Sequence, residues 1–275
     1  MSRRPGAVAR GGTAAQRRGY KAAHLLDGFQ ASLGISADLM RRSLTNVIRY
    51  CMDELLPPVI RDNYYFMYPF YRFWFNGSED LNAIMRFKEI VHSMSDEEFT
   101  AFYETLKCRA NIRPTDCSEA SLQWILQRID VHKNKTLLDV GCGRGHCIER
   151  FLGVGVDVTG CDIYTKPIGA SVAKYFLGNV EHLPFDDRSF DVVTCFHTLE
   201  HVRRLSTAFR ELKRVARNQL FLIVPQQRFF RFTLDLHIHF FYSPTYFRSL
   251  VGCEPSECAQ IGGDIVYCAY VDQRN

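Results

Sequence analysis

The sequence predicts an α/β protein with a mostly parallel sheet, a C-terminal antiparallel hairpin and an N-terminal helical cap. First, the apolar run 136–140 breaks into Gly141, Gly143 and Gly145, and a helical pattern over 146–151 follows, which indicates a strand, a tight turn and a helix. Second, short apolar runs alternate with helical segments over 156–251, as expected for parallel strands joined by crossovers. Third, residues 262–264 (Gly-Gly-Asp) separate two final strand patterns, which indicates a hairpin.

The basic charge of the chain is concentrated at its N-terminus. Six basic residues precede the first acid, Asp27, and the net charge of +4 becomes −2 once they are set aside. Residues 1–24 are therefore expected to be a disordered basic tail, with a transit peptide as the alternative. Because the remaining chain is not basic, we expect no nucleic-acid partner.

The cysteine pattern and the hydropathy indicate where the protein resides. Ten cysteines are scattered without a C-x-x-C pair, and Cys161, Cys195 and Cys268 fall inside expected buried strands. We interpret them as reduced thiols that act as small hydrophobic residues. No apolar run approaches the roughly 20 residues that span a bilayer. The expected location is cytoplasmic, or organellar if the basic N-terminus is a transit peptide.

Residues 25–115 are expected to form a helical, aromatic-rich cap. A helical repeat from Leu39 to Leu55 stops at Pro57-Pro58, and Ser78 and Ser95 are candidate helix starts, the second with a capping box to Glu98. Residues 63–75 hold nine aromatic side chains in thirteen positions. This stretch packs the cap onto the main domain, or it forms a lid over the substrate or a peripheral membrane contact.

Residues 116–275 are expected to form the main domain. A helix over 118–129 leads into the strand 136–140 and the helix 146–151. The remaining strands are expected at 156–162, 175–177, within 187–197 (a turn and a strand), 220–224, 260–261 and 265–271. Helices are expected from about 205 to 215 and over 244–251, and the link 163–171 is too short for a full crossover helix.

The glycine corner favours a cationic ligand over a dinucleotide. The third glycine comes one residue too early for G-x-x-G spacing, and His146 stands in its place. Asp139 lies two residues before the first glycine, where a carboxylate would repel a pyrophosphate. The stretch LLDVGCGRG over 137–145 resembles motif I of the class I S-adenosylmethionine-dependent methyltransferases, which have a Rossmann-like sheet. The resemblance covers about 122–270.

The resemblance implies a site for S-adenosylmethionine. Asp162 ends the second strand and corresponds to the acid that binds the adenosine ribose, and Asn179 stands where most relatives carry an adenine-binding aspartate. Asn still accepts a hydrogen bond there, but without charge assistance. The expected cofactor-binding residues are Asp139, Gly141, Cys142, Gly143, Gly145, Asp162, Ile163, Asn179, Val180, Glu181 and Phe196.

A histidine-rich group follows the fourth strand. His197, Glu200 and His201 lie at its end, and His237 lies after the fifth strand. Some relatives carry Glu-x-x-Glu-His here and bind a divalent metal. Two imidazoles and a carboxylate favour zinc or another transition metal. The alternatives are a general base at His201 or His237, or local packing of the histidines without metal.

The preferred function is methyl transfer to a small-molecule or saccharide-like acceptor, with O-methylation favoured. The first alternative is a methyltransferase fold that binds its ligand without activity, for which Asn179 is the support. The second is a nicotinamide or flavin oxidoreductase, which Asp139 and the glycine spacing oppose.

Overall fold

A computed structural model describes residues 51, 55–75, 80–105, 115–163, 174–253 and 255–271. The chain divides into two compact units, 1–57 and 58–275, and the second contains the elements discussed here. The predicted tail, most of the helix predicted over 39–55, Ser78 and the link beyond Ile163 lie outside the described residues. No helix among the described residues combines the length and the apolar composition needed to cross a bilayer.

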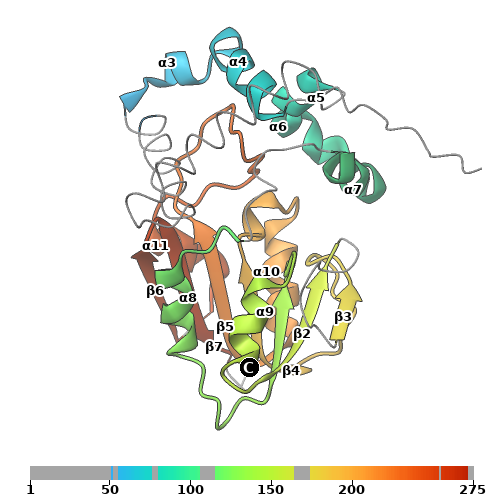
Figure 1. The fold of residues 1–275 in the computed structure, drawn as a ribbon, viewed down its shortest axis with the longest axis vertical. Coiled ribbons are helices and arrows are strands. Elements are labelled where there is room, and N and C mark those ends of the chain that lie inside the picture. The colour runs from blue at the N-terminus through green and yellow to red at the C-terminus, as the bar shows by residue number, and fades with distance from the viewer. Residues whose placement is uncertain are drawn as a thin grey trace, which may run out of the picture. The chain divides into compact units, whose positions relative to one another are not determined.

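A seven-stranded sheet forms the centre of the second unit, in the order β3-β2-β1-β4-β5-β7-β6 (Figure 1). Its strands are β1 (Thr136–Val140), β2 (Asp157–Asp162), β3 (Lys174–Leu177), β4 (Phe190–Phe196), β5 (Ala216–Pro225), β6 (Ser256–Ile261) and β7 (Asp264–Tyr270). The first five are parallel, and β7 pairs antiparallel with both β5 and β6. The predicted mostly parallel sheet with its C-terminal hairpin is confirmed.

Helices cover both faces of the sheet. On one face, α8 (Glu119–Leu126) and α9 (His146–Leu152) share a buried apolar cluster with the strands. On the other face, α10 (Leu205–Val215) and α11 (Pro244–Val251) share a second cluster. Adjacent residues Leu137 and Leu138 of β1 enter opposite clusters, as a strand buried on both faces requires. Cys161, Cys195 and Cys268 are buried free thiols, as predicted.

Among the element boundaries that differ from the sequence prediction are the end of α8 and the start of β6. Helix α8 ends at Leu126 rather than at 129, because the chain then turns through residues 127–134 and buried Asn134 donates to Gln219 of β5 at 2.7 Å. Strand β6 starts at Ser256 rather than at 260, since its whole length pairs with β7. Both differences depend on partners distant in sequence.

Short helices precede the sheet domain within the same unit. They are α3 (Pro58–Arg61), α4 (Tyr64–Trp74), α5 (Leu81–Met85), α6 (Phe87–Ile90), the 3-10 turn η2 (Val91–Ser93) and α7 (Asp96–Thr105). The predicted capping box is confirmed: the Ser95 amide donates to Glu98 Oε2 at 2.8 Å, and the Glu98 amide donates to Ser95 Oγ at 3.1 Å.

These helices pack on the long segment that follows β5. The Tyr71 hydroxyl donates to the Thr233 carbonyl oxygen at 2.7 Å, and Lys88 Nζ donates to the Phe230 carbonyl oxygen at 2.5 Å. The packing side of α4 includes the buried Met67 and Tyr71. Residues 58–105 therefore belong to the same compact unit as the sheet, and the domain boundary expected near residue 115 stays a prediction.

Candidate functional site

The glycine corner connects β1 to α9 at the carboxyl edge of the parallel strands. Gly141, Gly143 and Gly145 all have positive φ angles of +71°, +51° and +77°. At Gly141, a Cβ would also lie only 2.0 Å from Thr198 Oγ1, so this position requires glycine. At Gly143, a Cβ would meet no atom of the described residues within 4 Å, so this part of the loop borders open space among them.

Two carboxylates face this corner. Asp162 Oδ2 accepts the Gly143 amide at 2.7 Å, which fixes the end of β2 against the loop. Asp139 is buried, and its Oδ1 accepts the Thr194 hydroxyl at 2.7 Å. Burial raises the pKa of Asp139 to about 7; the Thr194 hydrogen bond opposes this effect, and the nearby Asp162 charge adds to it. This acidic, partly open corner fits a ligand that carries positive charge and no phosphate.

The loop after β3 is shaped by its own polar groups. Asn179 Oδ1 accepts the Glu181 amide at 2.9 Å, so part of its accepting capacity is used inside the loop. Val180 belongs to an apolar cluster of the sheet domain. Glu181 is buried, and its carboxylate accepts the amides of Arg203 and Arg204 at 2.8 Å each. The side chains of Val180 and Glu181 thus pack against the sheet domain and stabilise the conformation of this loop. A contact between Asn179 and adenine stays a prediction.

The remaining predicted cofactor residues lie at the same edge of the sheet. Cys142 is a buried loop residue, and burial raises its pKa well above the usual thiol value. Phe196 ends β4 and packs on Phe151 of α9 with ring centroids 6.1 Å apart. Ile163 is half-buried directly after β2. Because β1, β2 and β4 are adjacent and parallel, their carboxyl ends bring these residues together.

Glu200, His201 and His237 converge beside this corner. One potential ligand atom from each lies within 4.8 Å of the others. Glu200 and His201 belong to the 3-10 turn η4 (Leu199–His201) after β4. The amides of Ile238 and His239 donate to the Glu200 carbonyl oxygen at 2.7 and 3.0 Å, which holds the segment carrying His237 against η4.

His197 does not belong to this group. Its Nδ1 lies 3.4 Å from Glu200 Oε1, and its Nε2 lies 3.3 Å from Asp264 Oδ1. Burial would lower the pKa of His197, but hydrogen bonding to Asp264 and Glu200 outweighs burial and raises it to about 10. His197 therefore lies between the carboxylates of Glu200 and Asp264, outside the group formed by Glu200, His201 and His237, and its role as a metal ligand stays a prediction. The sequence reasoning had included it as a ligand.

Two neighbours of the histidines were not found from the sequence. Gln227 Oε1 lies 2.7 Å from His237 Nδ1, a contact that favours the tautomer with the proton on Nδ1 and the lone pair on Nε2. The Tyr103 hydroxyl of α7 lies 3.3 Å from His201 Nδ1. Gln227 lies three residues after the predicted strand 220–224, so its place at the carboxyl edge of the sheet could have been predicted from the sequence. No pattern in the sequence around Tyr103 indicated a contact with His201.

Comparison with known proteins supports one class for this domain. Residues 138–224 match the family model described as a methyltransferase domain. The chain is 31% identical over 135 residues to the ubiquinone biosynthesis O-methyltransferase of Thiobacillus denitrificans, covering 45% of this chain and 53% of that protein. It is 40% identical over 92 residues to the protein of the same name from Serratia proteamaculans, covering 30% and 38%.

The matches cover about half or less of these curated relatives. Among solved structures, a methyltransferase of Bacillus halodurans described as putative aligns with a TM-score of 0.46 and 17% identity, over 55% of this chain and 99% of that chain.

Proposed function

Since residues 138–224 form a methyltransferase domain of the class I, S-adenosylmethionine-dependent family, we propose that this protein is an enzyme that methylates an oxygen of a small-molecule acceptor. One observation carries this proposal: the glycine corner, Asp162 and the Glu200–His201–His237 group lie at one edge of the sheet. A donor site therefore adjoins groups that can handle the proton of a hydroxyl. The names of the relatives support O-methylation, and a saccharide-like acceptor stays a prediction.

The residues present fit the cofactor. The open side of Gly143 leaves room for a ligand, and Asp139 and Asp162 supply negative charge on either side of the loop. S-adenosylmethionine, when bound, supplies an electrophilic methyl group on a sulfonium. Asp162 is the proposed acceptor for ribose hydroxyls, and Asp139 the proposed partner of the positively charged methionine end.

The histidines fit the role of proton acceptor. An acceptor hydroxyl loses its proton as its oxygen attacks the methyl carbon. His237 Nε2 carries the lone pair for this proton in the tautomer that Gln227 favours, and His201 lies beside it with ring centroids 4.9 Å apart. Most of the rate enhancement comes from holding the acceptor oxygen and the methyl group in line.

Glu200, His201 and His237 also fit a metal ion. Glu200 Oε2 is buried and has no hydrogen-bond donor among the described residues, so a cation would satisfy it. Two imidazole nitrogens and one carboxylate oxygen suit zinc or another transition metal. Such an ion, when bound, would lower the pKa of an acceptor hydroxyl.

A calorimetric titration tests the proposed function. We expect S-adenosylhomocysteine to bind and NAD to give no heat. Incubation with S-adenosylmethionine and a cell extract should then yield a product heavier by one methylene. Binding without turnover would favour the inactive, ligand-binding alternative, and binding of NAD alone would favour an oxidoreductase.

Cofactor affinity should depend on pH through Asp139. Because the pKa of this carboxyl in the folded protein is about 7, it is mostly protonated at pH 6 and ionised at pH 8. Only the ionised form attracts the ammonium group of S-adenosylhomocysteine, so the Kd should be roughly tenfold higher at pH 6 than at pH 8. Calorimetry at both pH values measures this ratio.

The matched variant for this measurement is Asp139→Asn, which should bind more weakly and with little pH dependence. The pH dependence of the free energy of unfolding has the opposite sign from that of most carboxylates, whose pKa is lowered by folding. Since the folded state raises this pKa, the free energy of unfolding contributed by Asp139 falls as pH rises from about 4 to 7. An equal pH ratio in wild type and Asp139→Asn would remove Asp139 from the cofactor site.

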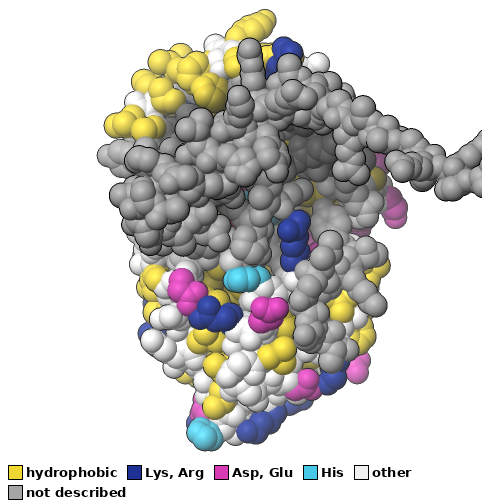
Figure 2. All heavy atoms as spheres, in the orientation of Figure 1, with side chains coloured by type: hydrophobic (Ala, Val, Ile, Leu, Met, Phe, Trp, Pro, Cys, Tyr) yellow, Lys and Arg dark blue, Asp and Glu magenta, His cyan; other side chains and the backbone are white. Residues whose placement is uncertain are grey.

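We also propose that α3 and α4 contact an anionic membrane surface. Large apolar side chains are exposed on both helices, namely Val59, Ile60, Tyr65, Phe70 and Phe73. Figure 2 shows hydrophobic side chains gathered over these helices. Arg72 of α4 is exposed, and neither helix contains an acid. An exposed apolar patch of this kind marks an interaction site, and the neighbouring arginine suits an anionic lipid surface.

Liposome flotation tests this contact. Wild type should float with vesicles containing anionic lipid, and Phe70→Ser/Phe73→Ser should lose most of that binding, because two apolar side chains no longer enter the lipid. Phe176→Ser, an exposed aromatic of β3, is the matched control and should bind like wild type. Unchanged flotation of the double variant, or none by wild type, would exclude the membrane contact.

A further inference from the structure

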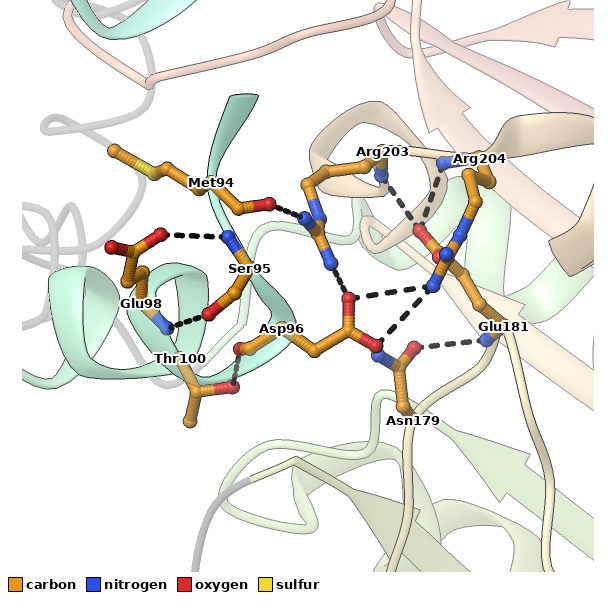
Figure 3. Close-up of polar contacts among 9 residues, drawn as sticks. All are labelled: Met94, Ser95, Asp96, Glu98, Thr100, Asn179, Glu181, Arg203 and Arg204. Atoms are coloured by element: carbon orange, nitrogen blue, oxygen red, sulfur yellow. Dashed lines mark hydrogen bonds and ion pairs between the residues drawn. The ribbon is translucent and has the colours of Figure 1, made fainter. Parts of the chain in front are cut away.

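Helix α7 begins at a cluster of ionic contacts with the sheet domain (Figure 3). The Asp96 carboxylate forms an ion pair with Arg203, and Arg204 Nη2 lies 3.4 Å from both of its oxygens. Arg203 also donates to the Met94 carbonyl oxygen and lies over the Phe99 ring at 5.0 Å. Its side chain is only 9% exposed, so the loss of its carboxylate partner would leave a largely desolvated charge.

The same two arginines hold the loop that follows β3. Their backbone amides both donate to Glu181 Oε1 at 2.8 Å, and Arg204 Nε donates to Glu181 Oε2 at 2.6 Å. The Glu181 amide in turn donates to Asn179 Oδ1 at 2.9 Å. A continuous set of contacts therefore runs from Asp96 on the cap to Asn179, the residue proposed to face adenine.

Helix α7 also reaches the proton-handling side of the site. Its Tyr103 hydroxyl lies 3.3 Å from His201 Nδ1 and 3.4 Å from the Leu236 carbonyl oxygen. Tyr103 packs on Phe99, one turn earlier, with ring centroids 4.9 Å apart. Phe99 is the residue over which Arg203 lies. The same helix therefore contacts Arg203 at its start and His201 near its end.

We propose that α7 couples the two halves of the site, with Asp96 as the positioning residue that links cofactor binding to the placement of Tyr103 on His201. This inference rests on the proposed cofactor site. In this scheme, cofactor binding orders the loop from Asn179 to Glu181. The ordered Glu181 carboxylate then keeps Arg203 and Arg204 in place, and these arginines keep the Asp96 carboxylate, and with it the start of α7, in place. Because coupling is reciprocal, weakening the contact at Asp96 must weaken cofactor binding.

The contact set is tested first without cofactor, by hydrogen exchange of the full chain. Asp96→Asn keeps the size of the side chain but removes its charge, so the amides of residues 203–204 and the start of α7 should exchange faster than in wild type. Glu257→Gln is the matched control, because it removes the charge of another exposed carboxylate that forms an ion pair, 3.0 Å to Arg128, on the edge strand β6. Equal exchange at 203–204 in both variants would overturn the link from Asp96 to Glu181.

The coupling is then tested with S-adenosylhomocysteine. The Kd should rise about three- to tenfold in Asp96→Asn, should stay within twofold of wild type in Glu257→Gln, and should recover in part in Asp96→Glu. In wild type, the ligand should slow exchange over 96–103, and this protection should be lost in Asp96→Asn. If Asp96 had only a structural role, Asp96→Asn would change the hydrogen exchange of residues 96–103 by the same amount with and without the ligand.

The outcomes separate the two proposals. An unchanged Kd in Asp96→Asn, or no protection of α7 by the ligand in wild type, overturns the coupling while cofactor binding stands. Failure of wild type to bind S-adenosylhomocysteine overturns the proposed function and, with it, the coupling. Even then, the hydrogen-exchange experiment without cofactor shows whether Asp96 stabilises the backbone at residues 203–204.

Discussion

Asp162→Ala should weaken binding of S-adenosylhomocysteine by roughly 30- to 1,000-fold, which corresponds to about 2–4 kcal/mol. Two effects add. The change removes the proposed acceptor for the ribose hydroxyls, and it leaves the Gly143 amide without the oxygen that it now contacts at 2.7 Å. The glycine loop then loses its fixed position against β2. Isothermal titration calorimetry measures the change.

The control for this experiment lies on the same strand. Asp157 begins β2 at the opposite end, where it is exposed and pairs with Lys174. Asp157→Ala should therefore bind S-adenosylhomocysteine like wild type, since it removes an exposed ion pair worth at most about 1 kcal/mol of stability. Equal titration heats for Asp162→Ala and wild type would remove Asp162 from the cofactor site.

Replacing His201 and His237 together by Ala should reduce methyl transfer by roughly 100- to 10,000-fold, because positioned proton transfer contributes about that much. The measurement is transfer of a labelled methyl group from S-adenosylmethionine into the small molecules of a cell extract. S-adenosylhomocysteine affinity should fall far less than methyl transfer, by at most the three- to tenfold that the coupling through Tyr103 and His201 transmits. His132→Ala, at an exposed position before β1, is the control.

Metal analysis of the same proteins separates the two roles of the histidines. If Glu200, His201 and His237 hold an ion, the purified wild type contains it in stoichiometric amount and the double variant does not. If His201 or His237 acts only as a base, the wild type keeps its activity in EDTA. Full activity of the double variant would contradict both roles and leave alignment of the reactants as the catalytic device.

The sequence alone predicted the sheet and the cofactor edge, for a local reason. A buried parallel strand is a short apolar run, and the turn after β1 requires glycine where φ is positive, so both are visible in consecutive residues. The position of Asp162 followed from the same logic, because the end of β2 meets the glycine loop in any sheet of this order. The capping box at Ser95 was equally local.

The tertiary structure decided which polar side chains share the site. His197 and His201 are close in sequence, but the positive φ of 47° at His197 and the nearby Asp264 assign His197 to an ion pair, while His201 lies next to His237. Asp264 comes from β7, 67 positions later, and no local pattern could indicate it.

The contacts of the cap helices were likewise decided by the tertiary structure. The sequence singled out residues 63–75 as the functional candidate within the cap. In the structure, α7 is the helix that contacts both Arg203 and His201. Local periodicity predicts an element and its apolar side, but it cannot identify the distant groups that the element meets. The sequence by itself therefore determined the sheet, the glycine corner and the expected class of cofactor, and packing between distant segments decided which carboxylates and histidines lie close together.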